Sequence, residues 1–268
     1  MSTTSVAVYG TGTMARGIAR LCASTGRRVV VLSGSAERAE RARDDLSAEV
    51  EGSDVSADRA DASACSVFVE ATVEDLETKR RALAEVEPLL DPDALMATTT
   101  SSLPITELAV PLERPGRFLG VHFFNPVHRM RLVEVVQGML TAEEAVDRGM
   151  VFARDLGKHP VRIPDRAGFL VNRLLIPYLN QAARLVEEGY ASVEDVDMAM
   201  KLGAAHPMGP FALIDLIGAD VVVAIGRSLH EEFKHLSEAP SPELMRRVTL
   251  GYLGRKNGRG YYEYPPKE

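Results

Sequence analysis

Short apolar runs alternate with helix-like patterns over residues 1–164. The runs are rich in Val, Ile, Leu and Phe and are bounded by glycine or polar positions, which is typical of buried strands in a parallel sheet. They predict strands at residues 6–9, 28–32, 66–70, 94–99, 118–122, 132–136 and 159–163. Helical patterns lie between them, notably at residues 36–49, 75–90 and 142–156. The alternation predicts an α/β fold built on a doubly wound, mainly parallel sheet.

The pattern changes after the last predicted strand to long helical segments punctuated by glycine and proline. We therefore predict two domains, an α/β domain over residues 1–164 and an all-helical domain over residues 165–268. The most apolar stretch of the second domain, residues 211–225, contains two aspartates. We expect it to form two buried helices of a soluble domain and no membrane span.

A glycine-rich turn, GTGTMARGIA, follows the first predicted strand directly. Gly10 permits a tight turn, Gly12 lets the backbone approach a pyrophosphate, and Ala15 is the third small residue, where the helix packs on the strand. The first helical residues, Thr13 and Met14, present backbone amides that can face an anion. Because another predicted strand follows this helix, we predict that the first domain is a Rossmann-type domain that binds a dinucleotide.

Composition and charge argue against several functions. The chain has 268 residues, of which 46% are hydrophobic, and a formal net charge of −7. This charge, without any basic stripe, disfavours nucleic acid as a partner. Cys22 and Cys65 lack the CxxC spacing of a metal or redox site, so we expect two reduced thiols and no bound metal. The start, MSTTSVAVYG, has neither a basic end nor a signal-length apolar run, and we expect a cytoplasmic protein.

The strongest candidate for chemistry is His122, which lies in the segment GVHFFNP. Glu134 follows in LVEVV, the next predicted strand. A histidine and a carboxylate on neighbouring strand ends can form an oriented acid/base pair. A histidine beside two phenylalanines is also common in protein cores, and these residues alone leave that alternative open.

From end to end, the chain resembles the short-chain-length, single-function 3-hydroxyacyl-CoA dehydrogenases, including the 3-hydroxybutyryl-CoA dehydrogenases. The resemblance rests on the ordered motifs GTGTMARGIA, VEATVEDLETK, TTTSSLPI, GVHFFNP, LVEVV, DRAGFLVNRLL, HPMGPFALIDLIGAD and GRKNGRGYYEY. It implies an oxidoreductase that interconverts 3-hydroxyacyl and 3-oxoacyl thioesters by hydride transfer with NAD(P), with an (S)-3-hydroxy product. It also implies that the helical domain binds the substrate and pairs two subunits, so we expect a homodimer.

The resemblance assigns roles to four residues in these motifs. His122 matches the general base that takes the proton of the 3-hydroxyl group, and Glu134 matches the carboxylate that orients its imidazole. Ser101 matches a serine that hydrogen-bonds the reacting oxygen, and Asn172 matches an asparagine that closes the site from the second domain. Both are neutral groups aimed at an oxygen on which negative charge develops.

Three more residues match cofactor contacts of the family. Glu74 and Lys79 match residues on the ribose and nicotinamide side, and Asn125 ends the strand that presents His122. An alternative stays open for Lys79, because an acid and a base at i, i+4 on a helix, here Asp75 and Lys79, are commonly a solvated pair.

The chain departs from the family at the end of the second predicted strand. Gly34 stands where an NAD-dependent member has an Asp or Glu that holds the ribose 2′-hydroxyl. Ser33, Gly34, Ser35 and Arg38, with Arg27 or Arg28 nearby, could instead accept a 2′-phosphate, with hydroxyl and guanidinium groups as donors. We expect NADP(H) to be used at least as well as NAD(H), although retention of NAD stays open.

A second departure is the short stretch between Gly34 and Glu70. Family members usually carry a longer, charged helical hairpin here that rests on the nucleotide end of coenzyme A, whereas this chain has one predicted helix and a polar loop at residues 52–63. With coenzyme A contacts weakened, the acyl group could be carried by an acyl carrier protein. Candidate cationic contacts to such an acidic carrier are Arg41, Arg43, Lys79, Arg80 and Arg81.

Two further alternatives stay open. Some members of the family oxidise a hydroxy acid with the same His/Glu pair, and some relatives of dehydrogenases bind nucleotides without catalysis. The quartet of Ser101, His122, Glu134 and Asn172 argues against a non-catalytic protein. The apolar residues around 174–179 and 207–213 favour an acyl chain over a hydroxy acid.

Overall fold

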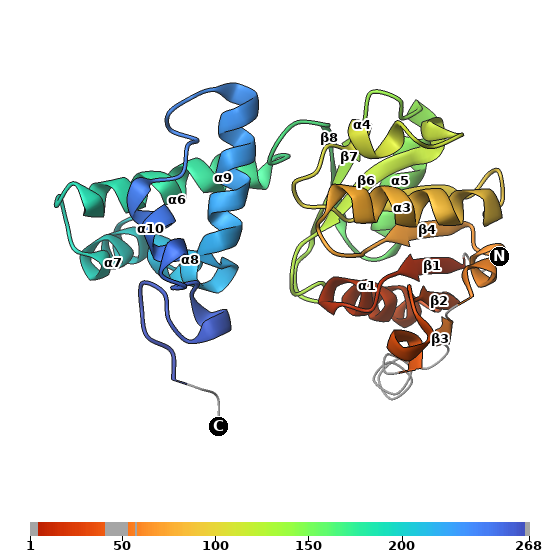
Figure 1. The fold of residues 1–268 in the computed structure, drawn as a ribbon, viewed down its shortest axis with the longest axis horizontal. Helices are drawn as coiled ribbons and strands as arrows, with labels where there is room; N and C mark the ends of the chain where they lie inside the picture. Colours follow the sequence, from red (N-terminus) through yellow and green to blue (C-terminus); the bar gives the residue numbers. More distant parts are fainter. Residues whose placement is uncertain (1–4, 41–52, 57, 266–268) are drawn as a thin grey trace. The chain divides into compact units, whose positions relative to one another are not determined.

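A computed structural model of the protein describes residues 5–40, 53–56 and 58–265. The chain forms two compact units, Met1–Phe169 and Leu170–Glu268 (Figure 1). The division falls a few residues after the predicted one at 164/165. The reason lies in Asp165, whose carboxylate accepts hydrogen bonds from the backbone N–H groups of Ile105 and Thr106 and so belongs to the first unit.

The first unit is built on one eight-stranded sheet with the strand order β3-β2-β1-β4-β5-β6-β7-β8. The strands are β1 (Val6–Tyr9), β2 (Val29–Leu32), β3 (Ser53–Ser56), β4 (Val67–Glu70), β5 (Leu95–Thr98), β6 (Phe118–Phe123), β7 (Leu132–Gln137) and β8 (His159–Pro164). Neighbouring strands are parallel except β6 and β7, which pair in antiparallel fashion. This confirms the predicted doubly wound, mainly parallel sheet.

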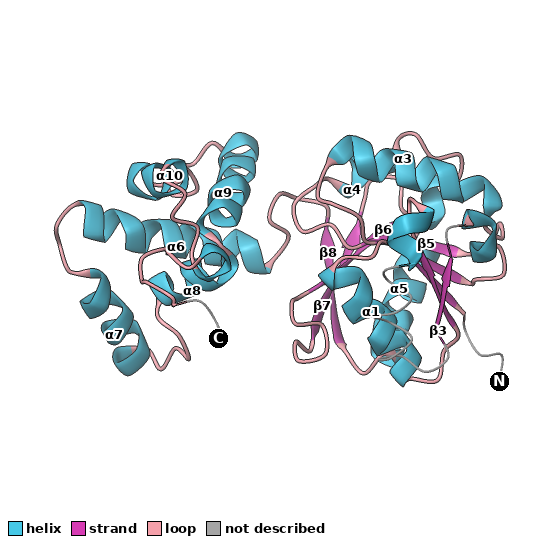
Figure 2. Ribbon diagram, turned by 60° about the horizontal axis from the view of Figure 1, so that its bottom comes forward, coloured by secondary structure: helices cyan, strands magenta, loops and turns pink. Residues whose placement is uncertain are grey.

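Helices cover both faces of this sheet (Figure 2). They are α1 (Thr13–Ser24), α3 (Leu76–Val86), α4 (Ile105–Ala109) and α5 (Glu143–Asp155), with short 3₁₀ turns at Glu87–Leu89 and Pro115–Arg117. One core cluster contains the apolar faces of α1 and α5, and the other contains those of α3 and α4. Because both faces are covered, the central strands are buried throughout, which explains their uninterrupted apolar sequences.

The shortened stretch after β2 differs from its prediction. The region predicted as a polar loop at residues 52–63 contains strand β3 and the 3₁₀-helix η1 (Arg59–Ala62). β3 is the edge strand and pairs with β2 through backbone hydrogen bonds, which need no apolar sequence. Of the helix predicted at residues 36–49, residues 36–40 are helical, and the rest lies outside the described residues, as do Arg41 and Arg43.

The second unit is helical. Its helices are α6 (Val171–Glu187), α7 (Val193–Gly203), α8 (Pro210–Ile217), α9 (Ala219–Phe233) and α10 (Pro242–Thr249), followed by the 3₁₀-helix η4 (Arg255–Asn257). The apolar stretch at residues 211–225 forms two helices, as predicted, and they meet at Gly218, whose φ of 106° is unfavourable for other residues. In the described part of the chain, no helix has the length and apolar character that a bilayer span requires.

Both cysteines are free thiols in the core of the first unit. Cys22 lies on the buried face of α1 and is 0% exposed. Burial raises the pKa of Cys22 to about 12 and also raises the pKa of Cys65. These thiols therefore remain protonated and act as small apolar groups.

Candidate active site

The candidate residues of the first unit gather at one edge of the sheet. Strands β1, β4, β5 and β6 run parallel, so their carboxyl ends lie at the same edge. The glycine turn follows β1, Glu74 follows β4, Ser101 follows β5, and His122 lies near the end of β6. Ligands of open α/β sheets bind at this edge.

His122 and Glu134 form a buried polar pair at this edge. They lie directly opposite each other in the antiparallel pairing of β6 and β7, and His122 Nδ1 is 2.6 Å from Glu134 Oε2. The two residues are 6% and 1% exposed. If the imidazole donates its Nδ1 proton to the carboxylate, Nε2 is the atom left to take up another proton. The pair predicted from the sequence therefore has the geometry of an oriented acid/base group.

Two aromatic rings hold the imidazole in place. The ring centroid of Phe124 is 4.5 Å and that of Phe169 is 5.5 Å from the centroid of His122. Phe169 has a φ of 51°, which a bulky side chain rarely adopts, directly after Gly168 with a φ of 72°. Phe169 was not predicted as a site residue, because nothing in the segment DRAGFLVN indicates that its ring packs against a residue of β6.

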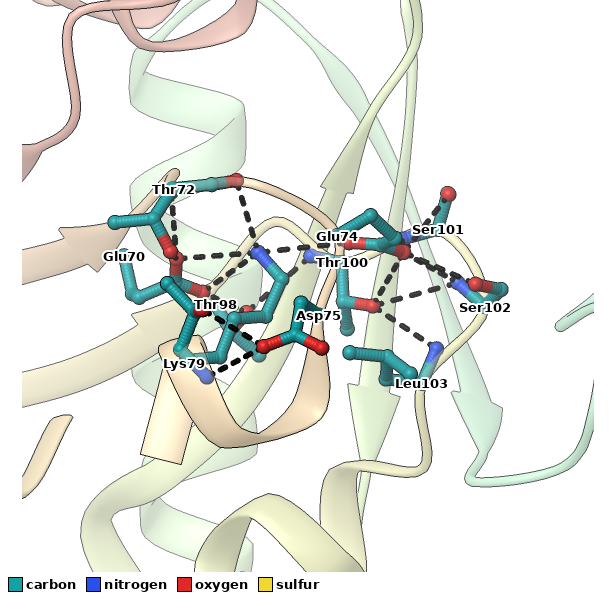
Figure 3. A network of polar contacts seen from close by, with 11 residues as sticks. Glu70, Thr72, Glu74, Asp75, Lys79, Thr98, Thr100, Ser101, Ser102 and Leu103 are labelled. Carbon is teal, nitrogen blue, oxygen red and sulfur yellow. Dashed lines mark hydrogen bonds and ion pairs between the residues drawn. The ribbon is translucent and has the colours of Figure 1, made fainter. Parts of the chain in front are cut away.

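Glu74 anchors the loop that carries Ser101 (Figure 3). Its Oε1 accepts hydrogen bonds from the hydroxyl of Thr100 at 2.7 Å, from the backbone N–H of Ser101 at 2.7 Å and from the hydroxyl of Ser101 at 3.0 Å. Ser102 adds a backbone and a hydroxyl donor, both at 3.1 Å. Burial favours the neutral acid, but the charge of Lys79 and these hydrogen bonds outweigh burial and lower the pKa of Glu74.

Lys79 contacts the Glu74 carboxylate and the loop that follows β4. Its ammonium is 2.9 Å from Glu70 Oε2 and 3.5 Å from Glu74 Oε2, and it donates to the carbonyl oxygen of Thr72. Glu70 and Lys79 are 0% and 1% exposed, so the pair is a buried ion pair shared by β4 and α3 (Figure 3). Glu70 was not predicted as a site residue, although a carboxylate that ends a buried apolar strand is a signal of a buried partner.

Two interpretations of Lys79 are corrected by this geometry. Lys79 does not pair with Asp75 on a solvated helix face, because Asp75 is the N-cap of α3 and its carboxylate accepts the N–H of Thr78. Lys79 is also too buried to contact an acidic carrier protein. Of the residues proposed for such a contact, Arg80 and Arg81 retain at least partial exposure.

A cavity of about 720 Å³ surrounds the glycine turn, within the size range of ligand pockets. Seven residues predicted to bind a cofactor line it, namely Gly10, Gly12, Thr13, Met14, Ser33, Gly34 and Arg38. A side chain at Gly10 would begin 2.3 Å from the carbonyl oxygen of Ala71, and Gly12 has open space where a side chain would be. A dinucleotide requires a turn whose backbone its pyrophosphate can approach closely. The residues of this cavity therefore fit a dinucleotide cofactor.

The remaining predicted cofactor residues, Ala15, Ser35, Glu74, Lys79 and Asn125, are not among the residues that line this cavity. Arg27 and Arg28 lie at the opposite end of β2 from Gly34, so they are not placed to meet a 2′-phosphate there. Ala15 is fully buried under the turn, and the Oγ of Ser35 accepts hydrogen bonds from the backbone N–H and the Nε of Arg38. Asn125 lies just beyond β6, where a cis peptide bond joins it to Pro126. The lining residues that were not predicted to bind the cofactor include Tyr9, Arg59, Arg81 and Glu85. Arg59 gave no signal because it lies in the stretch predicted as a loop.

Asn172 lies at the start of α6 in the second unit, and its predicted role stays a prediction.

Among the described residues, no group of three His, Cys, Asp or Glu side chains could hold a metal ion.

Two family models together match nearly the whole chain. The model described as the NAD binding domain of 3-hydroxyacyl-CoA dehydrogenase matches residues 5–56 and 50–166, and the model of its C-terminal domain matches residues 168–264. A 3-hydroxybutyryl-CoA dehydrogenase of Mycobacterium tuberculosis is 42% identical over 280 residues, covering 97% of this chain and 98% of the relative.

Solved structures agree with these matches. The crystal structure of M. tuberculosis FadB2 has a TM-score of 0.93 and 40% identity, covering 99% of this chain and 100% of the other. The crystal structure of the (S)-3-hydroxybutyryl-CoA dehydrogenase PaaH1 from Ralstonia eutropha has a TM-score of 0.93 and 34% identity, covering 98% of this chain and 100% of the other.

The same comparisons bear on the short stretch after β2. The alignment with the M. tuberculosis relative runs over 280 residues although this chain has 268, so it contains gaps in this chain. The match to the first family model is broken into two pieces that overlap at residues 50–56. The break in the family-model match falls at this stretch, as expected of a chain that is shortened there.

The anchoring of the Ser101 loop can be tested with Glu74→Gln. The amide cannot accept all the donors that meet the carboxylate, so we expect the free energy of unfolding to fall by about 1–3 kcal/mol in urea titrations at neutral pH. The matched control is Glu77→Gln, three residues later in the first turn of α3, whose side chain is 79% exposed. Equal losses in the two variants would contradict the anchoring role.

The pH dependence of this difference follows from the lowered pKa of Glu74. A carboxyl whose folded pKa lies below its unfolded pKa contributes fully above the unfolded value and loses that contribution as the pH falls through the folded value. The stability difference between wild type and Glu74→Gln should therefore be constant near neutral pH and shrink only under acidic conditions, below the usual range of a glutamate.

Proposed function

Because the chain belongs to the 3-hydroxyacyl-CoA dehydrogenase family, we propose that it interconverts an (S)-3-hydroxyacyl thioester and a 3-oxoacyl thioester of coenzyme A with NAD(P). The observation that carries this proposal is the 2.6 Å contact between His122 and Glu134 at the sheet edge that also bears the dinucleotide cavity. Two of the relatives reported above are named 3-hydroxybutyryl-CoA dehydrogenases, which favours a substrate with a short acyl chain.

His122 serves as the general base in this proposal. When the 3-hydroxyl is oxidised, its proton moves to Nε2 of His122, and the electron pair of the broken O–H bond forms the C=O bond of the 3-oxo product. The C3–H bond breaks, and its electron pair leaves with the hydrogen as hydride. A bound nicotinamide would supply the acceptor for this hydride. Glu134 stabilises the imidazolium that results, and the reverse reaction returns the same proton.

Ser101 and Asn172 would act on the reacting oxygen. In the described contacts the Ser101 hydroxyl donates to Glu74, which also holds the backbone N–H of Ser101. To donate to a substrate oxygen, the hydroxyl hydrogen turns away from Glu74 while the backbone bond keeps the residue in place. Asn172 would add an amide donor from the second unit, a role that rests on its match to the family motif.

Substitution of His122 tests this assignment. His122→Ala should lower turnover of a 3-hydroxyacyl thioester by about 10²- to 10⁴-fold, the usual contribution of a general base, while dinucleotide binding is kept. Glu134→Gln should lower turnover less, because the imidazole remains. The control is His128→Ala, an exposed histidine that follows the same strand. Nearly unchanged turnover in His122→Ala would show that the histidine is a core residue.

Two molecules are candidates for the carrier of the acyl group, coenzyme A and an acyl carrier protein. An acyl carrier protein is the alternative to coenzyme A, and its support is the short stretch after β2, where the match to the family model is broken. Of the proposed cationic contacts, Arg80 already pairs with Glu77, and Arg81 is exposed. We retain coenzyme A as the first proposal, because the relatives are named for it.

Turnover of acetoacetyl groups on the two carriers separates these proposals. Coenzyme A as the natural carrier predicts a kcat/KM for acetoacetyl-CoA that equals or exceeds that for the acetoacetyl carrier protein. A clear preference for the carrier protein would replace this proposal with the alternative. Turnover of neither thioester, with a free hydroxy acid oxidised instead, would contradict both.

We also propose that NADP(H) is used at least as well as NAD(H). Neither of the two residues that follow β2, Ser33 and Gly34, is acidic. A side chain at Gly34 would begin 3.7 Å from both Arg38 Nη2 and Tyr9 Oη, so the place of the usual carboxylate is surrounded by hydrogen-bond donors. These donors suit a 2′-phosphate better than a 2′-hydroxyl.

Dissociation constants for NADPH and NADH, measured by quenching of reduced-nicotinamide fluorescence or by calorimetry, test this preference. We expect NADPH to bind as tightly as NADH or more tightly. Gly34→Asp should restore a preference for NADH by about 10- to 100-fold, because its carboxylate repels the phosphate and accepts from the 2′-hydroxyl. A hundredfold preference of the wild type for NADH would contradict the proposal.

We further propose a homodimer formed through the second unit. The support on this chain is a set of exposed leucines on its helices, with Leu174 of α6 at 70%, Leu202 of α7 at 80% and Leu216 of α8 at 51%. Exposed apolar side chains in such number mark an interaction surface. The cytoplasmic location expected from the sequence stays a prediction.

A further inference from the structure

Arg59 reaches the dinucleotide cavity from the shortened stretch of the chain. It is the first residue of η1, which follows β3. The pairing of Leu32 with Ser56, and the hydrogen bond from the N–H of Ser33 to the carbonyl of Ser56, place the ends of β2 and β3 level with each other. Arg59 therefore emerges at the same carboxyl edge as Gly34, and both line the cavity.

The guanidinium of Arg59 is held in a defined position. Its Nε donates to Tyr9 Oη at 3.1 Å, and its Nη2 is 2.8 Å from Glu85 Oε2 on α3. Its Cζ lies 5.6 Å from the centroid of the Tyr9 ring, and the Arg59 side chain is 32% exposed. Contacts from β1 and α3 thus fix the cation while leaving part of it accessible, which reduces the entropy lost when a ligand binds.

Arg38 contacts the position that a side chain at Gly34 would occupy, and Arg59 is linked to it through Tyr9. That position is 3.7 Å from Arg38 Nη2 and 3.7 Å from Tyr9 Oη, the atom that accepts the hydrogen bond from Arg59. Arg38 is itself oriented by Ser35 Oγ, which accepts from its Nε at 3.2 Å. An anion at this position would meet two oriented guanidinium groups.

The charges on the cavity wall favour an anion here. Among the described residues, three arginines line the cavity, Arg38, Arg59 and Arg81, against one carboxylate, Glu85. Glu85 is paired with Arg59 and orients it, so it removes only part of the positive charge. A phosphate monoester carries close to two negative charges near neutral pH and accepts several hydrogen bonds, which suits planar guanidinium donors.

We propose that Arg59, together with Arg38, binds the 2′-phosphate of NADP(H) and that Arg59 is a specificity-determining residue for the cofactor. The inference rests on the proposed use of NADP(H) and adds a residue that the shortened stretch supplies. Tyr9 and Glu85 act as positioning residues for Arg59. The segment that has lost the hairpin near coenzyme A thereby supplies a phosphate contact at the cofactor.

Binding of cofactor fragments tests the inference without any turnover. The probes are adenosine 2′,5′-bisphosphate, which carries the phosphate in question, and 5′-AMP, which lacks it, both titrated into the full chain by calorimetry. Arg59→Met should weaken binding of the bisphosphate by about 10- to 100-fold, because one oriented charged contact is lost. The affinity for 5′-AMP should stay nearly unchanged. Arg59→Lys should recover part of the loss, because it restores the charge without the planar donors.

The matched control is Arg28→Met, which removes the same charge from an exposed position just before β2, at the opposite end of that strand. It should leave the affinities for both probes within about twofold of the wild type, because a distant exposed charge is screened by salt. Unchanged 5′-AMP binding by Arg59→Met also shows that the variant is folded. If Arg28→Met and Arg59→Met weaken bisphosphate binding equally, the effect comes from the net charge of the protein, and the inference is overturned.

The outcomes separate this inference from the proposals on which it rests. If the wild type prefers the bisphosphate and Arg59→Met keeps that preference, Arg59 has no such role, while the use of NADP(H) stands. If the wild type binds both probes equally, the preference for NADP(H) and the role of Arg59 fail together. Oxidation of a 3-hydroxyacyl thioester with NAD would still establish the dehydrogenase activity in either case.

Discussion

The shared direction of β1, β4, β5 and β6 is the constraint on which the candidate site of the first unit depends. Parallel strands end at one edge, so residues that lie far apart in the sequence become neighbours there. Glu74 follows β4, and its carboxylate holds Ser101, which follows β5. The Glu70–Lys79 pair beneath them joins the same strand to α3. A buried ion pair adds little net stability by itself, but it fixes the loop geometry that a reacting group requires.

The reversal of direction between β6 and β7 has a separate consequence. In an antiparallel pair, residues that lie opposite each other point to the same face, so the register of His122 with Glu134 is sufficient to bring their side chains together. A shift of the register by one residue would turn Glu134 to the other face. The apolar residues around Glu134 in LVEVV are buried and fix that register. Packing of the strand thus maintains the acid/base geometry.

Much of this arrangement could be predicted from the sequence because the central strands are apolar and regularly spaced. The strand VAVY and the turn after it have a strong local signal, and the His122 and Glu134 motifs lie on adjacent strands. β3 had no such signal, since the edge strand SDVS is polar and its pairing is made by the backbone. For Lys79, the sequence leaves a solvated pair with Asp75 open beside a cofactor contact, because the ion pair with Glu70 and the N-cap role of Asp75 show only in the folded structure.

The overall charge of the chain makes local geometry decisive at the cofactor site. With a formal net charge of −7, the protein repels an anionic cofactor and an anionic thioester at long range. Screening at physiological salt confines that repulsion to about 8 Å. Attraction must therefore come from short contacts, which the backbone amides of the glycine turn and the oriented arginines of the cavity can supply. In such a site, the orientation of Arg59 by Tyr9 and Glu85 matters as much as its charge, because a mobile arginine would pay its rotamer entropy on binding.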